Sequence, residues 1–255
     1  MGIFIKAGRV FGLACWLWTL GCGWLAAATD KTEVKVVLGE LADWGRSPQE
    51  WITRVEVACE HLLSTPEPTQ VVIRPFLYQE PSELARVSAL MLENFKNDEG
   101  YRSLPPEILA LYVAANRPEN LLLTMQTPGT FGYVLLANGD VEGIVILRPV
   151  SSEEGPILQV RRLHASLSGR RRYKGIGKTL LAICAAAAYT RRIPTLMTTA
   201  SLPAREFFQH LGWQGALIHT PYQVETAQLT VLLPQFKCTL DVAGQMQGLL
   251  SETAY

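Results

Sequence analysis

The sequence predicts an α/β fold in which a mixed, mostly antiparallel sheet is flanked by helices and preceded by an N-terminal hydrophobic segment. The first observation is composition, since 48% of the 255 residues are hydrophobic and 18% are charged. That balance supplies a large core and excludes a disordered or fibrous chain. The second is the order of elements: a strand, helices, an antiparallel meander, then helix, strand, helix, strand. The third is Asn138-Gly139, a pair typical of a β-hairpin.

A hydrophobic leader begins the chain. Lys6 and Arg9 precede an uncharged run at 10–28, which ends in Ala26-Ala27-Ala28. This pattern predicts that 1–28 is a signal peptide or a membrane anchor that contacts a membrane through 10–28. Because the basic start stays in the cytoplasm, we expect a membrane-anchored or exported protein. A packing helix, or a start codon further downstream, would instead give a cytoplasmic one.

A helical extension and linker are predicted at 29–69. Ser47-Pro48-Gln49-Glu50 has the pattern of a capping box with proline at the first helical position. Hydrophobic residues then recur at helical spacing over 48–63. Thr65-Pro66-Glu67-Pro68 ends that helix. The main domain is therefore predicted to begin near Gln70.

Strands and helices then alternate through this domain. The β-branched run at 71–74 predicts a strand, and helices are expected at 82–95 and 106–115. Strands at 131–137 and 141–148 form the hairpin around Asn138-Gly139. A third strand covers 157–167.

The last elements are a helix, a strand, a helix and a strand. An alanine-rich helix is predicted at 178–190 and a strand at 195–199. We expect Ser201 to cap a helix that ends at Gly212. A final strand is predicted at 226–233.

Cysteine usage and net charge exclude several classes of protein. The chain has 23 basic and 23 acidic residues, so no overall field attracts nucleic acid or anionic lipid. The five cysteines form no CxxC pair and no metal-ligand spacing with the four histidines. We therefore predict no metal, and buried free thiols at Cys59, Cys184 and Cys238.

The segment 170–178 carries the sharpest local signal. Seven basic residues and no acidic one lie between Arg161 and Lys178. Gly175 and Gly177 let backbone amides approach a ligand, and the amino end of the next helix favours an anion. No nucleic-acid partner is expected, because the run holds a single aromatic residue and the chain is neutral.

Spacing separates three interpretations of these glycines. A phosphate-binding P-loop needs a glycine where Arg172 stands. A dinucleotide-binding fingerprint needs one where Leu180 stands. The pattern that remains is Arg172-x-x-Gly175-x-Gly177.

With this pattern the chain resembles the GNAT superfamily of CoA-dependent N-acyltransferases. Ser201-Leu202-Pro203-Ala204, followed by the aromatic pair and the Gly-Trp within 207–213, is similar to the second signature of that family. The resemblance covers 70–236 and leaves 237–255 as a C-terminal tail. It implies the GNAT fold, acetyl-CoA as co-substrate, and an amine acceptor, a small molecule or a protein, that attacks the thioester directly in a ternary complex.

The resemblance also implies which residues bind the cofactor. Backbone amides on the strand before the motif would hold the acyl carbonyl, and those of the motif the pyrophosphate. The cofactor-binding residues it implies are Leu163, Ala165, Leu167, Arg172, Tyr173, Lys174, Gly175, Ile176, Gly177, Lys178, Ser201 and Phe208.

The sequence departs from the family at the catalytic positions. Phe208 stands where a general-acid tyrosine is common, and 157–168 contains no Asp or Glu. The catalytic candidates are therefore His164, Tyr173 and Ser201. These departures keep open an alternative, a catalytically silent module of GNAT fold that binds acyl-CoA or a partner and regulates it.

Overall fold

The structure is a computed structural model that describes residues 32–38, 48–65, 67–97, 99–102, 104–201, 204–224 and 229–242. The predicted leader at 1–28 and most of the predicted tail at 237–255 lie outside these ranges. Among the described helices, none is both long and apolar enough to cross a membrane.

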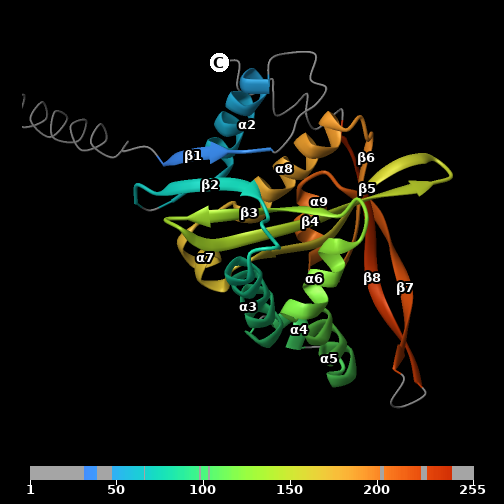
Figure 1. The fold of residues 1–255 in the computed structure, drawn as a ribbon. Helices are drawn as coiled ribbons and strands as arrows, with labels where there is room; N and C mark the ends of the chain where they lie inside the picture. Colours follow the sequence, from blue (N-terminus) through green and yellow to red (C-terminus); the bar gives the residue numbers. More distant parts are fainter. Residues whose placement is uncertain are drawn as a thin grey trace, which may run out of the picture.

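An eight-stranded mixed sheet forms the centre of the molecule (Figure 1). Its strand order is β1-β2-β3-β4-β5-β6-β8-β7, and the pairs β1–β2 and β5–β6 are parallel while the others are antiparallel. This arrangement confirms the predicted fold class. The strands are β1 Glu33–Val36, β2 Gln70–Pro75, β3 Phe131–Ala137, β4 Asp140–Ser152, β5 Gly155–Ala165, β6 Thr195–Ser201, β7 Gln214–Val224 and β8 Leu229–Asp241.

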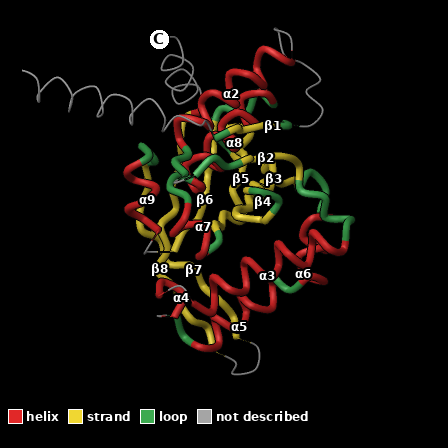
Figure 2. Tube along the Cα trace, turned by 90° about the vertical axis from the view of Figure 1, so that its left-hand side faces the viewer, coloured by secondary structure: helices red, strands yellow, loops and turns green. Residues whose placement is uncertain are grey.

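Helices cover both faces of the sheet, as Figure 2 shows from a second side. One apolar core lies between the sheet and the helices α2 and α8, and a second lies between the sheet and α3, α5 and α6. The helices are α2 Pro48–Leu62, α3 Pro81–Asn97, α4 Glu99–Arg102, α5 Pro106–Ala115, α6 Pro118–Gln126, α7 Leu167–Arg172, α8 Ile176–Thr190 and α9 Arg205–His210.

The elements before Gln70 pack into this fold. β1 pairs in parallel with β2 at one edge of the sheet. α2 lies against α8, where the rings of Trp51 and Tyr189 are 5.1 Å apart between centroids. The predicted capping-box helix is therefore present and buries its apolar stripe on the main core.

The predicted hairpin joins β3 and β4. Asn138 and Gly139 have φ angles of 51° and 88°. Positive φ at both central residues is the geometry of a type I′ turn, which asparagine and glycine adopt at low cost. The two helices predicted at 82–95 and 106–115 are also confirmed, as α3 and α5.

Strand β5 contains one extra residue. Ile146 of β4 faces Arg162, but the next residue, Leu147, faces Val160, so Arg161 forms a β-bulge. Before the bulge Leu158 and Val160 point into the core beneath α8. After it the alternation is reversed, so that Arg162 and His164 point toward the α3 side.

Two predictions, on the end of β5 and on Ser201, are corrected. The strand ends at Ala165, and Leu167–Arg172 forms the short helix α7. The reason is local, because the Ser166 hydroxyl caps this helix by accepting the Gly169 N–H at 2.7 Å. Ser201 does not cap a helix: it is the last residue of β6, pairs with Gln235, and α9 starts later, after Ala204.

The final strand is longer than predicted and has a partner that the sequence analysis missed. β8 spans Leu229–Asp241, and β7 spans Gln214–Val224 beside it. β7 is an edge strand, and its register places Gly215 opposite Cys238 and Pro221 opposite Leu232. In a sequence, glycine and proline usually indicate that a strand ends, which is why β7 was not predicted. Both residues are tolerated on an edge strand.

Candidate functional site

A cavity of about 630 Å³ lies between β5 and β6. These parallel strands pair only over 157–160 and 195–198, and the bulge at Arg161 begins where the pairing ends. Beyond that point no ladder joins β5 and β6. The lining residues are Phe95, Tyr101, Tyr112, Val160, Arg161, Arg162, Leu163, His164, Ala165, Arg170, Tyr173, Lys174, Gly175, Ile176, Gly177, Thr198, Thr199, Ala200, Ser201, Ala204, Phe207 and Phe208.

The amino end of α8 forms one wall of this cavity. Gly175 caps the helix with φ 95°, a left-handed conformation, and no side chain accepts from the first turn. The first amides of a helix have no acceptor within the helix, and they carry the positive end of its dipole. Gly175, Ile176 and Gly177 therefore provide a place for an anion at the cavity wall.

The segment that follows α2 supports this wall from behind. Ser64 and Lys174 exchange two backbone hydrogen bonds, with N···O distances of 3.0 and 2.9 Å. A Cβ atom added to Gly175 would lie 1.9 Å from the carbonyl oxygen of Leu62. Position 175 thus requires glycine for two reasons, the close approach of the Leu62 carbonyl and the left-handed φ angle. The sequence analysis missed this contact, because it joins residues that are far apart in the chain.

Arg172 lies near a buried carboxylate. Its Nη2 lies 3.9 Å from Oε1 of Glu142, whose side chain is 4% exposed. Glu142 also accepts a short hydrogen bond from the Ser166 hydroxyl. Glu142 comes from β4, because Gly143 pairs with Ala165 and places its neighbour under α7. It is not among the residues that line the cavity, so it does not replace the catalytic carboxylate that 157–168 lacks.

Most of the predicted cofactor-binding residues line the cavity. They are Leu163, Ala165, Tyr173, Lys174, Gly175, Ile176, Gly177, Ser201 and Phe208. The other three, Leu167, Arg172 and Lys178, are not among the lining residues. The three catalytic candidates His164, Tyr173 and Ser201 all line it.

His164 is buried, with 6% of its surface exposed. The Asn94 side-chain amide donates to the Ala165 carbonyl at 2.9 Å, and the same nitrogen lies 3.4 Å from His164 Nδ1. An amide nitrogen can only donate, so a neutral His164 accepts at Nδ1 and carries its proton on Nε2. Asn94 is fully buried on α3 and so fixes the orientation of the imidazole.

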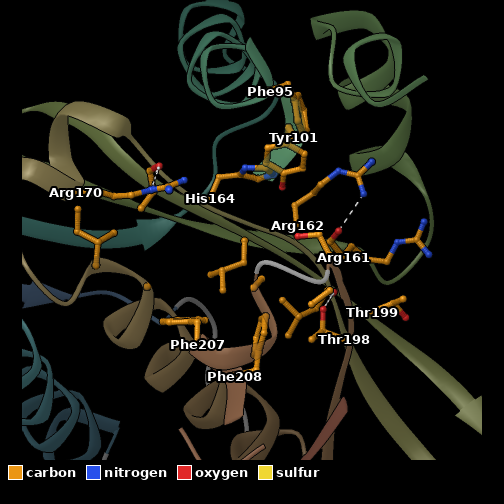
Figure 3. A pocket seen from close by; sticks show the side chains of 18 of the residues that line it. Phe95, Tyr101, Arg161, Arg162, His164, Arg170, Thr198, Thr199, Phe207 and Phe208 are labelled. Atoms are coloured by element: carbon orange, nitrogen blue, oxygen red, sulfur yellow. Dashed lines mark hydrogen bonds between the residues drawn. The ribbon is translucent and has the colours of Figure 1, made fainter. Parts of the chain in front are cut away.

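Two aromatic rings, from α3 and α4, pack against His164, and a third, from α5, packs against them. Phe95 packs edge-on against its ring at a centroid distance of 5.3 Å, and Tyr101 stacks on it at 6.3 Å. Tyr112 lies 5.7 Å from Phe95 and 6.2 Å from Tyr101. Figure 3 shows Phe95, Tyr101 and His164 on one side of the cavity and Phe207 and Phe208 on the other. The sequence analysis found no signal for these aromatic residues beyond the apolar stripe that contains Phe95.

Phe208 contributes only an apolar ring to the site. It is buried, and its ring centroid lies 5.2 Å from that of Phe207 and 5.1 Å from that of Trp213. The described residues also hold no cluster of three or more His, Cys, Asp or Glu side chains that could hold a metal ion.

The three described cysteines are buried free thiols, as predicted. Burial raises the pKa of the Cys59 and Cys238 thiols to about 12, and it raises that of Cys184 still further. No thiolate nucleophile is therefore available from these positions at neutral pH.

Comparisons with known proteins identify the fold. A GCN5-related N-acetyltransferase from Rhodopseudomonas palustris matches with a TM-score of 0.50 and 18% identity, over 70% of this chain and 97% of that chain. The PaiA N-acetyltransferase from Thermoplasma acidophilum, solved in complex with coenzyme A, matches with a TM-score of 0.50 and 14% identity, over 68% and 99%. No family model and no curated protein sequence matches the chain. The protein therefore has the GNAT fold.

Proposed function

We propose that the protein is an N-acetyltransferase that moves the acetyl group of acetyl-CoA to a primary amine. The observation that carries this proposal is the opening between β5 and β6, where their pairing ends at Val160. The amino end of α8 lies beside this opening. That opening joins a site for an anion, at Gly175–Gly177, to an aromatic chamber formed by Phe95, Tyr101 and Tyr112. Acetyl-CoA has a pyrophosphate, which needs the anion site, and a thioester, which needs the chamber where the acceptor amine binds.

The reaction requires one bond to form, one to break and one proton to move. The amine nitrogen attacks the thioester carbonyl carbon, the C–S bond breaks, and the proton lost by the amine balances the one gained by sulfur. Direct attack in a ternary complex lets the protein act by positioning both reactants. No ladder joins β5 to β6 beyond Val160, which supports a role for the backbone of Leu163–Ala165 in holding the acyl carbonyl.

His164 is the candidate that we favour for stabilising the leaving group. Its contact with Asn94 leaves the proton on Nε2, so the neutral ring can donate a hydrogen bond to the sulfur as negative charge develops there. We expect His164→Ala to lower kcat by at least about a hundredfold while leaving acetyl-CoA binding unchanged. Tyr173→Phe and Ser201→Ala are the control variants for the His164 change, because Tyr173 and Ser201 also line the cavity.

The first test is binding of acetyl-CoA by thermal shift. Ligand at a hundred times its dissociation constant should stabilise the fold by about 2.7 kcal/mol. Two lysines near the amino end of α8 provide a control: Lys174 precedes the helix and lines the cavity, and Lys178 lies in its first turn and does not. We expect Lys174→Ala to weaken acetyl-CoA binding about tenfold, the effect of a lost charge-assisted hydrogen bond, and Lys178→Ala to change it much less. A folded protein that shows no shift would contradict the proposal.

A second candidate function is a catalytically silent acyl-CoA-binding module. Phe208 favours it, because an apolar ring lines the cavity where family members often carry a tyrosine. Release of free CoA in the presence of amine acceptors separates the two functions. Binding of acetyl-CoA without turnover of any acceptor class would favour the silent module.

A further inference from the structure

One buried carboxylate, that of Glu142, has no part in the proposed reaction. Glu142 lies on β4, is 3% exposed, and is not among the residues that line the cavity. A carboxylate loses its hydration on burial, so it is stable there only where the protein supplies hydrogen bonds in return. The residues that make those hydrogen bonds therefore indicate what the carboxylate does.

The hydrogen bonds of Glu142 lead to the start of α7. Its side chain accepts a short hydrogen bond from the Ser166 hydroxyl, and its backbone carbonyl accepts the Ser166 N–H at 2.9 Å. The Ser166 side-chain oxygen in turn accepts the Gly169 N–H at 2.7 Å. A hydroxyl has one proton to donate, and here it goes to Glu142, so the serine oxygen keeps its lone pairs for Gly169.

The same chain of hydrogen bonds continues to the wall of the cavity. The Gly169 carbonyl accepts the N–H of Tyr173 at 2.6 Å, and Tyr173 lines the cavity. Position 169 has no room for a side chain, because an added Cβ would collide with both Glu142 Oε2 and Ser166 Oγ. The carboxylate, the serine cap and the first turn of α7 therefore form one packed unit that ends at the cavity.

The oxygen atoms of Glu142 contribute more to this unit than its charge does. Arg172 lies 3.9 Å from Glu142 Oε1, but its side chain is 57% exposed. Ion pairs that reach into solvent contribute little to stability. The Ser166 hydroxyl, by contrast, is buried and bonds to the carboxylate directly. Hydrogen bonds of this kind are among the strong ones in proteins.

On the basis of the proposed acetyl transfer, we infer that Glu142 is a positioning residue for the cofactor. By holding Ser166 and the first turn of α7, it fixes the segment that leads into the anion site at Gly175–Gly177. The segment after α2 holds the other end, through the backbone of Lys174 and the close approach to Gly175. The anion site thus depends on a carboxylate that does not touch it.

The first test compares two buried carboxylates. Glu142→Ala removes the acceptor of the Ser166 hydroxyl. Glu83→Gln is the control, because Glu83 is 2% exposed, bonds to Arg74 and is not among the cavity-lining residues. Both changes should destabilise the fold, so acetyl-CoA binding is measured by calorimetry at a temperature where each full-length protein is folded. We expect Glu142→Ala to raise Kd about tenfold and Glu83→Gln to change it less than about twofold.

A conservative variant separates the hydrogen bond from the charge. Glu142→Gln keeps an oxygen that can accept from Ser166, and it should bind acetyl-CoA within about threefold of the unaltered protein. Ser166→Ala breaks the same chain one step later. Adding it to Glu142→Ala should therefore weaken binding no further than Glu142→Ala alone. An equal loss in Glu142→Gln and Glu142→Ala would overturn the role given to the hydrogen bond.

Hydrogen exchange tests the position of this segment without any cofactor. Peptides that cover 167–177 are followed by mass spectrometry. We expect their amides to exchange at least about tenfold faster in Glu142→Ala, because the amides of Gly169 and Tyr173 are protected by this chain of hydrogen bonds, and to be unchanged in Glu83→Gln. If Glu142→Ala does not fold, Ser166→Ala makes the same comparison.

Unchanged exchange over 167–177 in a folded Glu142→Ala protein would overturn the inference. An equal loss of acetyl-CoA affinity in Glu83→Gln would do the same, because the effect would then follow from lower stability alone. The two proposals fail separately. An unaltered protein that does not bind acetyl-CoA contradicts the proposed function, and the exchange measurement still decides whether Glu142 holds the segment.

Discussion

Gly175→Ala tests the contact between the segment after α2 and the amino end of α8. The first cost is conformational, since a left-handed φ disfavours any side chain by about 1–2 kcal/mol. The second is steric, because the new Cβ would lie 1.9 Å from the Leu62 carbonyl oxygen, against a normal minimum of 3.0 Å. The carbonyl must move, and the two Ser64–Lys174 hydrogen bonds move with it. Each contributes about 0.5–1.5 kcal/mol, so the total destabilisation should be about 2–5 kcal/mol.

Gly212→Ala is the matched control for this change. Gly212 also has a left-handed φ, of 80°, but an added Cβ would meet nothing within 4 Å. It should therefore lose only the conformational part, about 1–2 kcal/mol. Urea unfolding of both variants gives the difference, which we expect to be about 1–3 kcal/mol. If Gly175→Ala is no more destabilising than Gly212→Ala, the segment after α2 does not support the wall of the cavity.

Three further predictions concern stability and reactivity. Ser166→Ala removes the cap of α7 and should lower the free energy of unfolding by about 1 kcal/mol, measured in urea. Burial raises the pKa of Glu83, but hydrogen bonds from Arg74 and the Leu77 N–H outweigh it, and the pKa lies below its ordinary value. The ionised Glu83 therefore stabilises the fold above its unfolded pKa, and this stability is lost as pH falls through the lower, folded pKa. Glu83→Gln should cost about 3 kcal/mol at pH 7 and flatten that acid dependence, seen as unfolding curves measured across the acid range. Cys59, Cys184 and Cys238 should resist alkylation in the native protein and react in urea, as measured by mass spectrometry. Labelling of any of them in the native protein would contradict its burial.

Elements with a local signal were predicted well from the sequence. The helix at 106–115 and the strand at 131–137 have the predicted bounds, since each is delimited by proline or by the Asn138-Gly139 turn. Ser201 was misplaced for the opposite reason. A serine before a helical pattern is a common cap, but here the β6–β8 ladder extends the strand through it. That pairing partner lies more than thirty residues away and leaves no mark near Ser201.

The site was predicted only in part for the same reason. The glycines at 175 and 177 lie on one loop, so their pattern is readable in the sequence. Glu142, Asn94 and Arg162 reach the site or its loop from other elements, and only strand register and helix packing bring them together. His164 and Arg162 alternate along β5, as residues on one face of a strand do. The alternation does not reveal that the bulge reverses that face relative to the first half of the strand.

The bulge at Arg161 decides which side of the sheet the end of β5 faces. If Arg161 paired with β4 as its neighbours do, the alternation along β5 would be unbroken. His164 and Arg162 would then turn toward α8, while Leu163 and Ala165, which now pack against the α8 core, would turn into the aromatic chamber. The composition of the strand would be the same, yet each chemical group would face the wrong compartment. Along β5, function depends on the pairing register as strictly as on the residues themselves.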